Sequence, residues 1–136
     1  MPERQLQCVV VTPEKAVLDA PADFVALPLY DGELGVLPRR AAMIGRLGFG
    51  DLRIKSGNQT QHYFIDGGFA QVRSNVVTVL TPRAIKAENI DKAAAEQALK
   101  TAQGLATTPQ AQEEQQKTQQ RARGQLRVAE RAAGSH

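Results

Sequence analysis

The sequence has little of what small-molecule enzymes use to build a reactive pocket. Its 136 residues contain no tryptophan, a single cysteine, two histidines and 4% aromatic residues. One cysteine excludes an internal disulfide framework, and His62 and His136, far apart and without a cysteine pair, supply no metal-ligand cluster. The lone thiol, Cys8 in the apolar run LQCVVV, is expected to be a small buried side chain of a strand rather than a reactive group.

Membrane-spanning and catalytic motifs are also missing. No run approaches the roughly 18 apolar residues that a spanning helix needs, and the N-terminal MPERQLQ lacks a signal-peptide core. The glycines of GFG (48–50) and DGG (66–68) do not open a helix, so we expect them to allow close backbone approach or a bulge rather than to hold a phosphate. No nucleophile motif is present. The sequence predicts a non-enzymatic chain on the cytosolic side of a membrane or in the cytosol.

The first part of the chain has the pattern of strands. From Leu6 to about Ile85, short apolar or alternating runs are interrupted by turn residues roughly every 8 to 12 positions. DLRIKSGNQTQHYFID (51–66) predicts a hairpin with SGNQ as its turn, and FAQVRSNVVTVL (69–80) predicts another with RSN as the reversal. Val77, Val79 and Leu80 are expected to reach the core or a sheet edge. We predict an antiparallel β-sandwich over residues 1–85.

After Pro82 the composition changes to alanine, glutamine and charged residues, which favour helix. The sequence predicts a helical hairpin over residues 86–136, with helices at 87–103, starting near Asn89 or Asp91, and at 111–133. Contacts between small residues bury little area, so we expect the hairpin to be held weakly and to open. The expected apolar stripes are Ile90, Ala94, Ala98, Leu99 and Ala102 in the first helix, and Thr118, Ala122, Leu126, Ala129 and Ala133 in the second.

The second helix is open to several interpretations. QEEQQKTQQRARGQ could be a solvated helix face or a partly disordered tail, and Gly124 inside it costs about 1 kcal/mol relative to alanine. Arg123, Arg127 and Arg131 recur every four residues, so a helix here would carry a basic stripe that suits an acidic protein partner more than a duplex groove. The alternative function is a basic adaptor or nucleic-acid-binding module that uses this helix.

Three blocks give the chain a family resemblance: DGELGVLP (31–38), YFIDGGFAQVRSNVVTVLTPRAI (63–85) and QLRVAE (125–130). In this order, within a sandwich followed by an alanine-rich hairpin, they resemble the epsilon subunit of rotary proton-translocating ATP synthases. The resemblance implies a non-catalytic central-stalk subunit without a cofactor, which couples c-ring rotation to the gamma subunit and regulates ATP hydrolysis through its helices. It also implies a peripheral location on the cytoplasmic face of the bacterial inner membrane.

The resemblance also assigns contact residues. It implies a c-ring contact at Asp31, Gly32 and Glu33, and a gamma or ring contact at Arg39, Arg40 and Met43. Arg39 and Arg40 replace the family's usual Gly-His, so two added positive charges could meet acidic groups on gamma or c. Glu33 taken alone could also be a solvated turn carboxylate.

In bacterial relatives the helices can extend towards the catalytic beta and alpha subunits, and some relatives bind ATP in the folded form. Here Ile90 and Asp91 match the nucleotide motif that opens the first helix, but Ala94 stands at the arginine position. Arg121 is retained, and Gln125 stands where ATP-binding relatives often carry arginine. Since guanidinium groups supply the charge-assisted bonds to phosphate, we expect ATP to bind weakly or not at all. In the extended state, Arg123, Arg127 and Arg131 are expected to contact acidic segments of the catalytic subunits.

Overall fold

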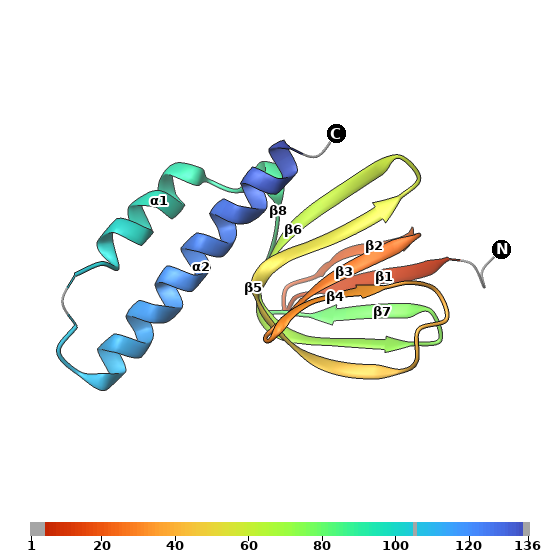
Figure 1. Ribbon diagram of the computed structural model, residues 1–136, viewed down its shortest axis with the longest axis horizontal. Helices are drawn as coiled ribbons and strands as arrows, with labels where there is room; N and C mark the ends of the chain where they lie inside the picture. The colour runs from red at the N-terminus through yellow and green to blue at the C-terminus, as the bar shows by residue number, and fades with distance from the viewer. Residues whose placement is uncertain (1–4, 105, 135–136) are drawn as a thin grey trace.

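The computed structural model describes residues 5–104 and 106–134. In this part of the chain, eight strands come first and two α-helices follow. Figure 1 shows the strands gathered into a sandwich with the helices beside it. The strands are β1 (Leu6–Val11), β2 (Ala16–Ala22), β3 (Phe24–Leu29), β4 (Gly32–Val36), β5 (Met43–Ser56), β6 (Gln59–Arg73), β7 (Val76–Leu80) and β8 (Ala84–Lys86). The short 3-10 helix η2 (Ala87–Asn89) leads into α1 (Lys92–Thr101) and α2 (Pro109–Ala133). The predicted order, a β-sandwich and then a helical hairpin, is confirmed.

The sheet is organised around one long hairpin, β5–β6. The strand order is β2-β1-β7-β6-β5-β3-β4, and β8 pairs with β6 outside this path. The first part of β6 pairs with β8 at 63–65, and its second part pairs with β7 at 69–73. At the junction, Gly68 has a φ of +107°, and a Cβ there would lie 2.0 Å from the Leu80 carbonyl oxygen. Only glycine fits, so the expectation of close backbone approach is confirmed.

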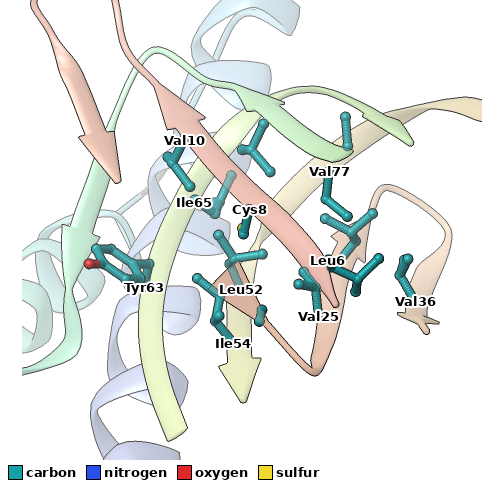
Figure 2. Packing of buried hydrophobic residues seen from close by; sticks show 14 of the residues in the cluster. Leu6, Cys8, Val10, Val25, Val36, Leu52, Ile54, Tyr63, Ile65 and Val77 are labelled. Carbon is teal, nitrogen blue, oxygen red and sulfur yellow. The ribbon is translucent and has the colours of Figure 1, made fainter. Parts of the chain in front are cut away.

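The sandwich core is built by alternate residues of the strands. Leu6, Cys8 and Val10 of β1 are each at most 1% exposed, and Figure 2 shows them among side chains from β3, β4, β5, β6 and β7. Fully burying an aliphatic side chain of this kind stabilises the fold by about 1.5–3 kcal/mol. Burial, together with the charge of Asp19, raises the pKa of the Cys8 thiol to about 12. Cys8 is thus the buried, unreactive side chain that the sequence predicted.

Both predicted hairpin turns are present. Gly57 has a φ of +60° between β5 and β6, and Ser74 and Asn75 have φ values of +49° and +64° between β6 and β7. Val77 and Val79 are fully buried as expected. The expectation for Leu80 is wrong: it is 53% exposed, because β7 lies between β1 and β6 and alternation turns the side chain after Val79 to the outer face.

Side-chain caps fix the start of each helix. Asp91 precedes α1, and its Oδ1 accepts a hydrogen bond from the Ala94 backbone N–H at 3.0 Å. Thr108 precedes α2, and its Oγ1 accepts from the Ala111 N–H at 3.0 Å, with Pro109 in the first turn. The first helix is shorter than predicted because residues 87–89 form η2. The second is one continuous helix, so the alternative of a disordered tail over 112–125 is wrong.

The helix α2 lies between α1 and the sandwich in Figure 1. Its buried residues are Ala122, Gly124, Val128 and Ala129, while α1 buries only Ala95 within its bounds. The predicted stripes are therefore only partly right: Ala94 is exposed, and α2 buries residues against two neighbours instead of one. Neither helix in the described part of the chain is long and apolar enough to cross a membrane.

Candidate functional site

The outer face of the β5–β6 hairpin divides into a covered and an uncovered half. Near the middle of the hairpin, Phe49 pairs with Asp66 and Asp51 pairs with Phe64. These four side chains face α2 and form the covered half. Further along, where Arg46 pairs with Phe69, neither of the two described α-helices covers the sheet (Figure 1).

At Gly124, α2 lies so close to the sheet that there is no room for a larger side chain. A Cβ at this position would lie 2.9 Å from Phe64 Cε1 and 3.0 Å from the Phe49 carbonyl oxygen. Phe64 is fully buried, but it is not part of the sandwich core, to which its neighbours Tyr63 and Ile65 belong. The helix therefore buries Phe64, and the residue that sequence reasoning treated as a weakness of the helix is what allows it to dock.

An ion pair holds α2 on one side of Gly124. The Arg121 Nε donates to Asp66 Oδ1 at 3.1 Å and Oδ2 at 3.0 Å. The same guanidinium lies over the Phe49 ring, 5.5 Å from its centroid. Asp66 is mostly buried while the Arg121 side chain is 37% exposed, so the pair is partly desolvated and stronger than a surface pair. Arg121, which the resemblance assigns to a nucleotide motif, thus links α2 to β6 in the docked arrangement.

A second set of charges lies on the other side of Gly124, near the end of α2. Arg131 Nη1 is 3.5 Å from Glu33 Oε2 and 3.6 Å from Asp51 Oδ2. Arg53 Nη2 lies 3.6 Å from the other Glu33 oxygen. Glu33 is therefore not a simple solvated turn carboxylate, because it joins β4 to both β5 and α2.

A buried acid–histidine pair lies beneath this second set. His62 Nδ1 is 2.9 Å from Asp51 Oδ2 and 3.1 Å from Oδ1. The two residues are 7% and 3% exposed, and His62 Nε2 is buried with no hydrogen-bond partner among the residues that the structure describes. Sequence reasoning considered His62 only as a metal ligand and missed this pair. The pair follows only from the strand register, which places Arg53 opposite His62 and Asp51 two residues before Arg53 in β5.

The uncovered half carries exposed apolar side chains. Ile44 of β5, Phe69 of β6 and Leu80 of β7 are 75%, 57% and 53% exposed, and Phe69 pairs directly with Leu80. We call these three residues the apolar strip. Large apolar side chains gathered on one outer sheet face are typical of a protein interface.

The predicted ring and gamma contacts lie at opposite ends of β4. Asp31 is in the turn before the strand, and Gly32 and Glu33 begin it. Arg39 and Arg40 follow the far end, where Arg39 has a φ of +71° and its N–H donates to Asn75 Oδ1 at 2.7 Å. Met43 starts β5 and packs partly buried against the sandwich core. The structure does not bring the two predicted sets together.

The residues of the degenerate nucleotide motif are also separated. Ile90 and Asp91 line a cleft of about 710 Å³ between β6, η2 and the end of α2, but Arg121 does not line it. The cleft has two lysines, Lys86 and Lys92, which are offset by Glu88 and Asp91. A cleft with this balance of charge offers little attraction for a triphosphate.

The basic stripe lines a second cleft, of about 640 Å³, next to Tyr30 and Gly32. Arg131 is engaged with Glu33 and Asp51, whereas Arg123 and Arg127 form no ion pair with any residue that the structure describes. The three arginines therefore line the same cleft but differ in their ion pairs. One holds the helix down and two remain open to solvent.

The family model and the most similar curated proteins point to the same family. The family model for the beta-sandwich domain of the ATP synthase delta/epsilon chain matches residues 5–87. The ATP synthase epsilon chain of Rhodopirellula baltica is 50% identical over 125 residues, which cover 91% of this chain and 98% of the relative. That of Synechococcus sp. strain JA-2-3B'a(2-13) is 39% identical over 124 residues, covering 89% and 90%.

Solved structures share the fold at lower identity. A chain in the cryo-EM structure of Euglena gracilis mitochondrial ATP synthase, OSCP/F1/c-ring, has a TM-score of 0.72 and 24% identity, covering 98% of this chain and 82% of that one. A chain of the Tetrahymena thermophila mitochondrial ATP synthase central stalk/c-ring has a TM-score of 0.70 and 16% identity, covering 93% and 98%. Both combine a similar sandwich and helices.

Proposed function

The chain belongs to the family of ATP synthase epsilon chains, non-catalytic stalk subunits of that enzyme, and we propose that its apolar strip is the surface that binds the gamma subunit. The observation that carries this is the exposure of Ile44, Phe69 and Leu80 on one sheet face that α2 leaves uncovered. Covering such side chains gains about 25 cal/mol per Å² of apolar surface. The strip can thus anchor the sandwich to a rotating neighbour.

The turn before β4 is proposed to face the c ring. Asp31, Gly32 and Glu33 lie at the end of the sandwich where α2 docks, and Asp31 is exposed there. Arg39 and Arg40 lie at the opposite end of β4 and Met43 is partly buried, so these three fit a gamma contact better than a ring contact. With ring and gamma held at different places, the subunit can couple rotation of one to the other.

Crosslinking tests this placement. Glu33→Cys in the reconstituted enzyme is expected to form a disulfide with a cysteine in the polar loop of c. Asn58→Cys, exposed in the β5–β6 turn, is the matched control and is expected to crosslink far less. Cys8 does not interfere because it is fully buried. Equal yields at the two positions would contradict the ring contact.

We further propose that the helices regulate ATP hydrolysis by leaving the sandwich. Once α2 is released, Arg131 loses Glu33 and Asp51 and joins Arg123 and Arg127 as a free basic stripe for acidic segments of the catalytic beta and alpha subunits. Replacing all three by alanine is expected to relieve inhibition of ATP hydrolysis that depends on the helices. Unchanged inhibition would contradict this role.

ATP itself is not the proposed ligand of the docked state. Ala94 and Gln125 stand where phosphate-binding arginines are needed, and Arg121 is bound to Asp66. Each charge-assisted bond is typically worth about 1.5–3 kcal/mol, so two missing arginines weaken binding by several powers of ten. Calorimetry is expected to detect no binding, or weak binding, at millimolar ATP, and micromolar affinity would contradict it.

The alternative of a nucleic-acid-binding adaptor is not favoured. Two of the arginines in α2 are engaged in ion pairs with the sandwich, so the docked helix does not present a continuous basic face. Within the complex, we propose a peripheral position on the cytoplasmic face of the bacterial inner membrane, held there through the c ring rather than by direct insertion.

A further inference from the structure

The apolar strip has a charged neighbour on one side. Arg46 pairs with Phe69 across β5 and β6, and Phe69 pairs with Leu80 across β6 and β7. On the other side of Arg46, the Tyr30 N–H donates a hydrogen bond to the Arg46 carbonyl oxygen at 2.8 Å. Side chains of directly paired residues on one sheet face lie next to each other. Tyr30 and Arg46 therefore continue the row that Phe69 and Leu80 begin.

The Tyr30 ring orders the Arg46 side chain. The guanidinium carbon of Arg46 lies 4.2 Å from the centroid of this ring, where the face of the ring attracts a cation. Tyr30 is itself 66% exposed, so the stacked pair lies on the surface. A guanidinium that is already held loses less rotational freedom when a partner binds it. Tyrosine and arginine are also the residue types that contribute most to binding energy in protein interfaces.

The charge of Arg46 is not neutralised within the chain. Among the residues that the structure describes, no carboxylate forms an ion pair with this guanidinium. Asp31 directly follows Tyr30 and is exposed, but it is not paired with Arg46. The N–H donors of Arg46 are therefore left for water or for a partner.

The cleft that the basic stripe lines adds positive charge beside this row. Its two acids already have a cation, because Arg131 Nη1 lies 3.5 Å from Glu33 and 3.6 Å from Asp51. Arg123 and Arg127 line the same cleft, and neither forms an ion pair with a described residue. The border between the apolar strip and the docked helix thus carries an excess of positive charge.

We propose that Arg46 selects an acidic surface of gamma, whose carboxylate binds the guanidinium at the edge of the apolar contact. This inference rests on the proposed contact between the apolar strip and gamma. A partner that covers Phe69 also removes water from the neighbouring Arg46, and a charge that loses water without gaining an acceptor opposes binding. A carboxylate replaces the lost water with charge-assisted, bidentate hydrogen bonds. The surrounding positive charge favours this acceptor over a neutral one.

Calorimetry of the full-length chain with purified gamma tests the role of Arg46. Arg46→Gln removes the charge and is expected to bind gamma about tenfold more weakly, through the loss of a charge-assisted pair. Arg46→Lys keeps the charge without the planar fork and is expected to recover part of the affinity. Lys55→Gln is the matched control, because it removes one charge from an exposed position near the other end of β5. It is expected to bind like the unaltered chain.

The salt dependence of the same affinities identifies the acceptor. The affinity of the unaltered chain is expected to fall as the salt concentration is raised from about 0.05 to 0.5 M, because salt screens charge pairs. Arg46→Gln is expected to show a smaller fall, whereas Lys55→Gln keeps the full one. An equally steep fall in Arg46→Gln would overturn the acidic acceptor, and unaltered affinity in this variant would overturn the role of Arg46.

Leu80→Glu separates this inference from the gamma contact itself. Leu80 lies on the far side of Phe69 from Arg46, so this variant places a charge in the apolar strip and leaves the arginine in place. Circular dichroism verifies that each variant folds. Weaker gamma binding by Leu80→Glu together with unaltered binding by Arg46→Gln would overturn only the role of Arg46. Unaltered binding by both variants would contradict the gamma contact as well.

Discussion

At the scale of single residues, Gly124 decides whether α2 can dock. A helix gains about 1 kcal/mol when an interior glycine becomes alanine, so helix propensity alone favours replacement. A Cβ at position 124 would nevertheless lie only 3.0 Å from the backbone carbonyl oxygen of Phe49. Because a backbone carbonyl cannot rotate away as a side chain can, contact with the sheet opposes what the isolated helix prefers.

Gly124→Ala is therefore expected to strengthen the helix and weaken its docking by about 1–3 kcal/mol, the usual range for overpacking a tight contact. Hydrogen–deuterium exchange is expected to be faster for the backbone amides of β6 around Phe64, while the exchange rates of the sandwich core stay unchanged. Gly134→Ala is the matched control, since a Cβ there meets only ordinary contacts at 3.7 Å and beyond. Equal exchange in the two variants would contradict the assigned role.

Cys8 gives a prediction with a defined pH dependence. Its pKa is raised from 9.0 to about 12, first by burial, so the native thiol is expected to resist iodoacetamide at pH 8 and to react only when the chain unfolds in urea. Because the pKa is raised in the folded chain, the protonated thiol contributes its full share to folding stability below its unfolded-state pKa near 9. This contribution is lost as the pH rises towards 12. Rapid alkylation in the native state at pH 8 would contradict it.

Local chemistry made some residues predictable and left others open. Cys8 sits in an apolar run, and SGNQ and RSN contain residues that tolerate positive φ, so burial and turns followed from the sequence. Gly124 did not, because its role arises from a helix and a strand that are far apart in the chain. The Asp51–His62 pair did not, because it depends on the register of β5 against β6. The prediction for Leu80 was wrong because side chains alternate along β7. Since Val77 and Val79 point into the core, Leu80 points outward.

At the scale of elements, α2 is held by a glycine contact with an ion pair on either side. Arg121 and Asp66 are 55 positions apart in sequence, and their pairing requires both the register of β6 and the rotation of α2 about its axis. The helix starts were predictable, since Asp91, Thr108 and Pro109 have local capping roles. The buried stripe of α2 was only partly predictable, because it contacts the sheet as well as α1.

A double-mutant cycle tests the first of these ion pairs. Arg121→Gln and Asp66→Asn are each expected to weaken docking, and the double variant is expected to lose less than the sum. We expect a coupling energy of about 0.5–1.5 kcal/mol for a partly exposed, charge-assisted pair. Docking is measured by fluorescence energy transfer between labels on Asn58→Cys in the β5–β6 turn and Gln116→Cys in α2, both exposed positions.

Arg123→Gln is the matched control for this cycle, because Arg123 lies on the same helix and forms no ion pair within the described residues. It is expected to leave docking unchanged. Strictly additive effects of Arg121→Gln and Asp66→Asn would contradict the pairing.

At the scale of the whole molecule, one long hairpin serves two surfaces. The covered half of β5–β6 receives the chain's own helix, and the uncovered half presents the apolar strip. The strands and helices, and the family, could be predicted from the sequence. The division of the hairpin could not, because it depends on where α2 docks in three dimensions. This division adds Ile44, Phe69 and Leu80 to the gamma contact proposed for Arg39, Arg40 and Met43.

The affinity of the full-length chain for purified gamma tests this assignment most directly. The double variant Ile44→Glu, Phe69→Glu places two charges in the proposed apolar interface and is expected to bind roughly a hundredfold more weakly or worse, since each buried unpaired charge costs more than the 1.4 kcal/mol that corresponds to tenfold. Gln59→Glu, which adds one charge at an exposed position of the same strand β6, is expected to bind like the unaltered chain. Circular dichroism verifies that the variants fold. If the folded double variant binds gamma with unaltered affinity in calorimetry, the apolar strip is not the stalk contact.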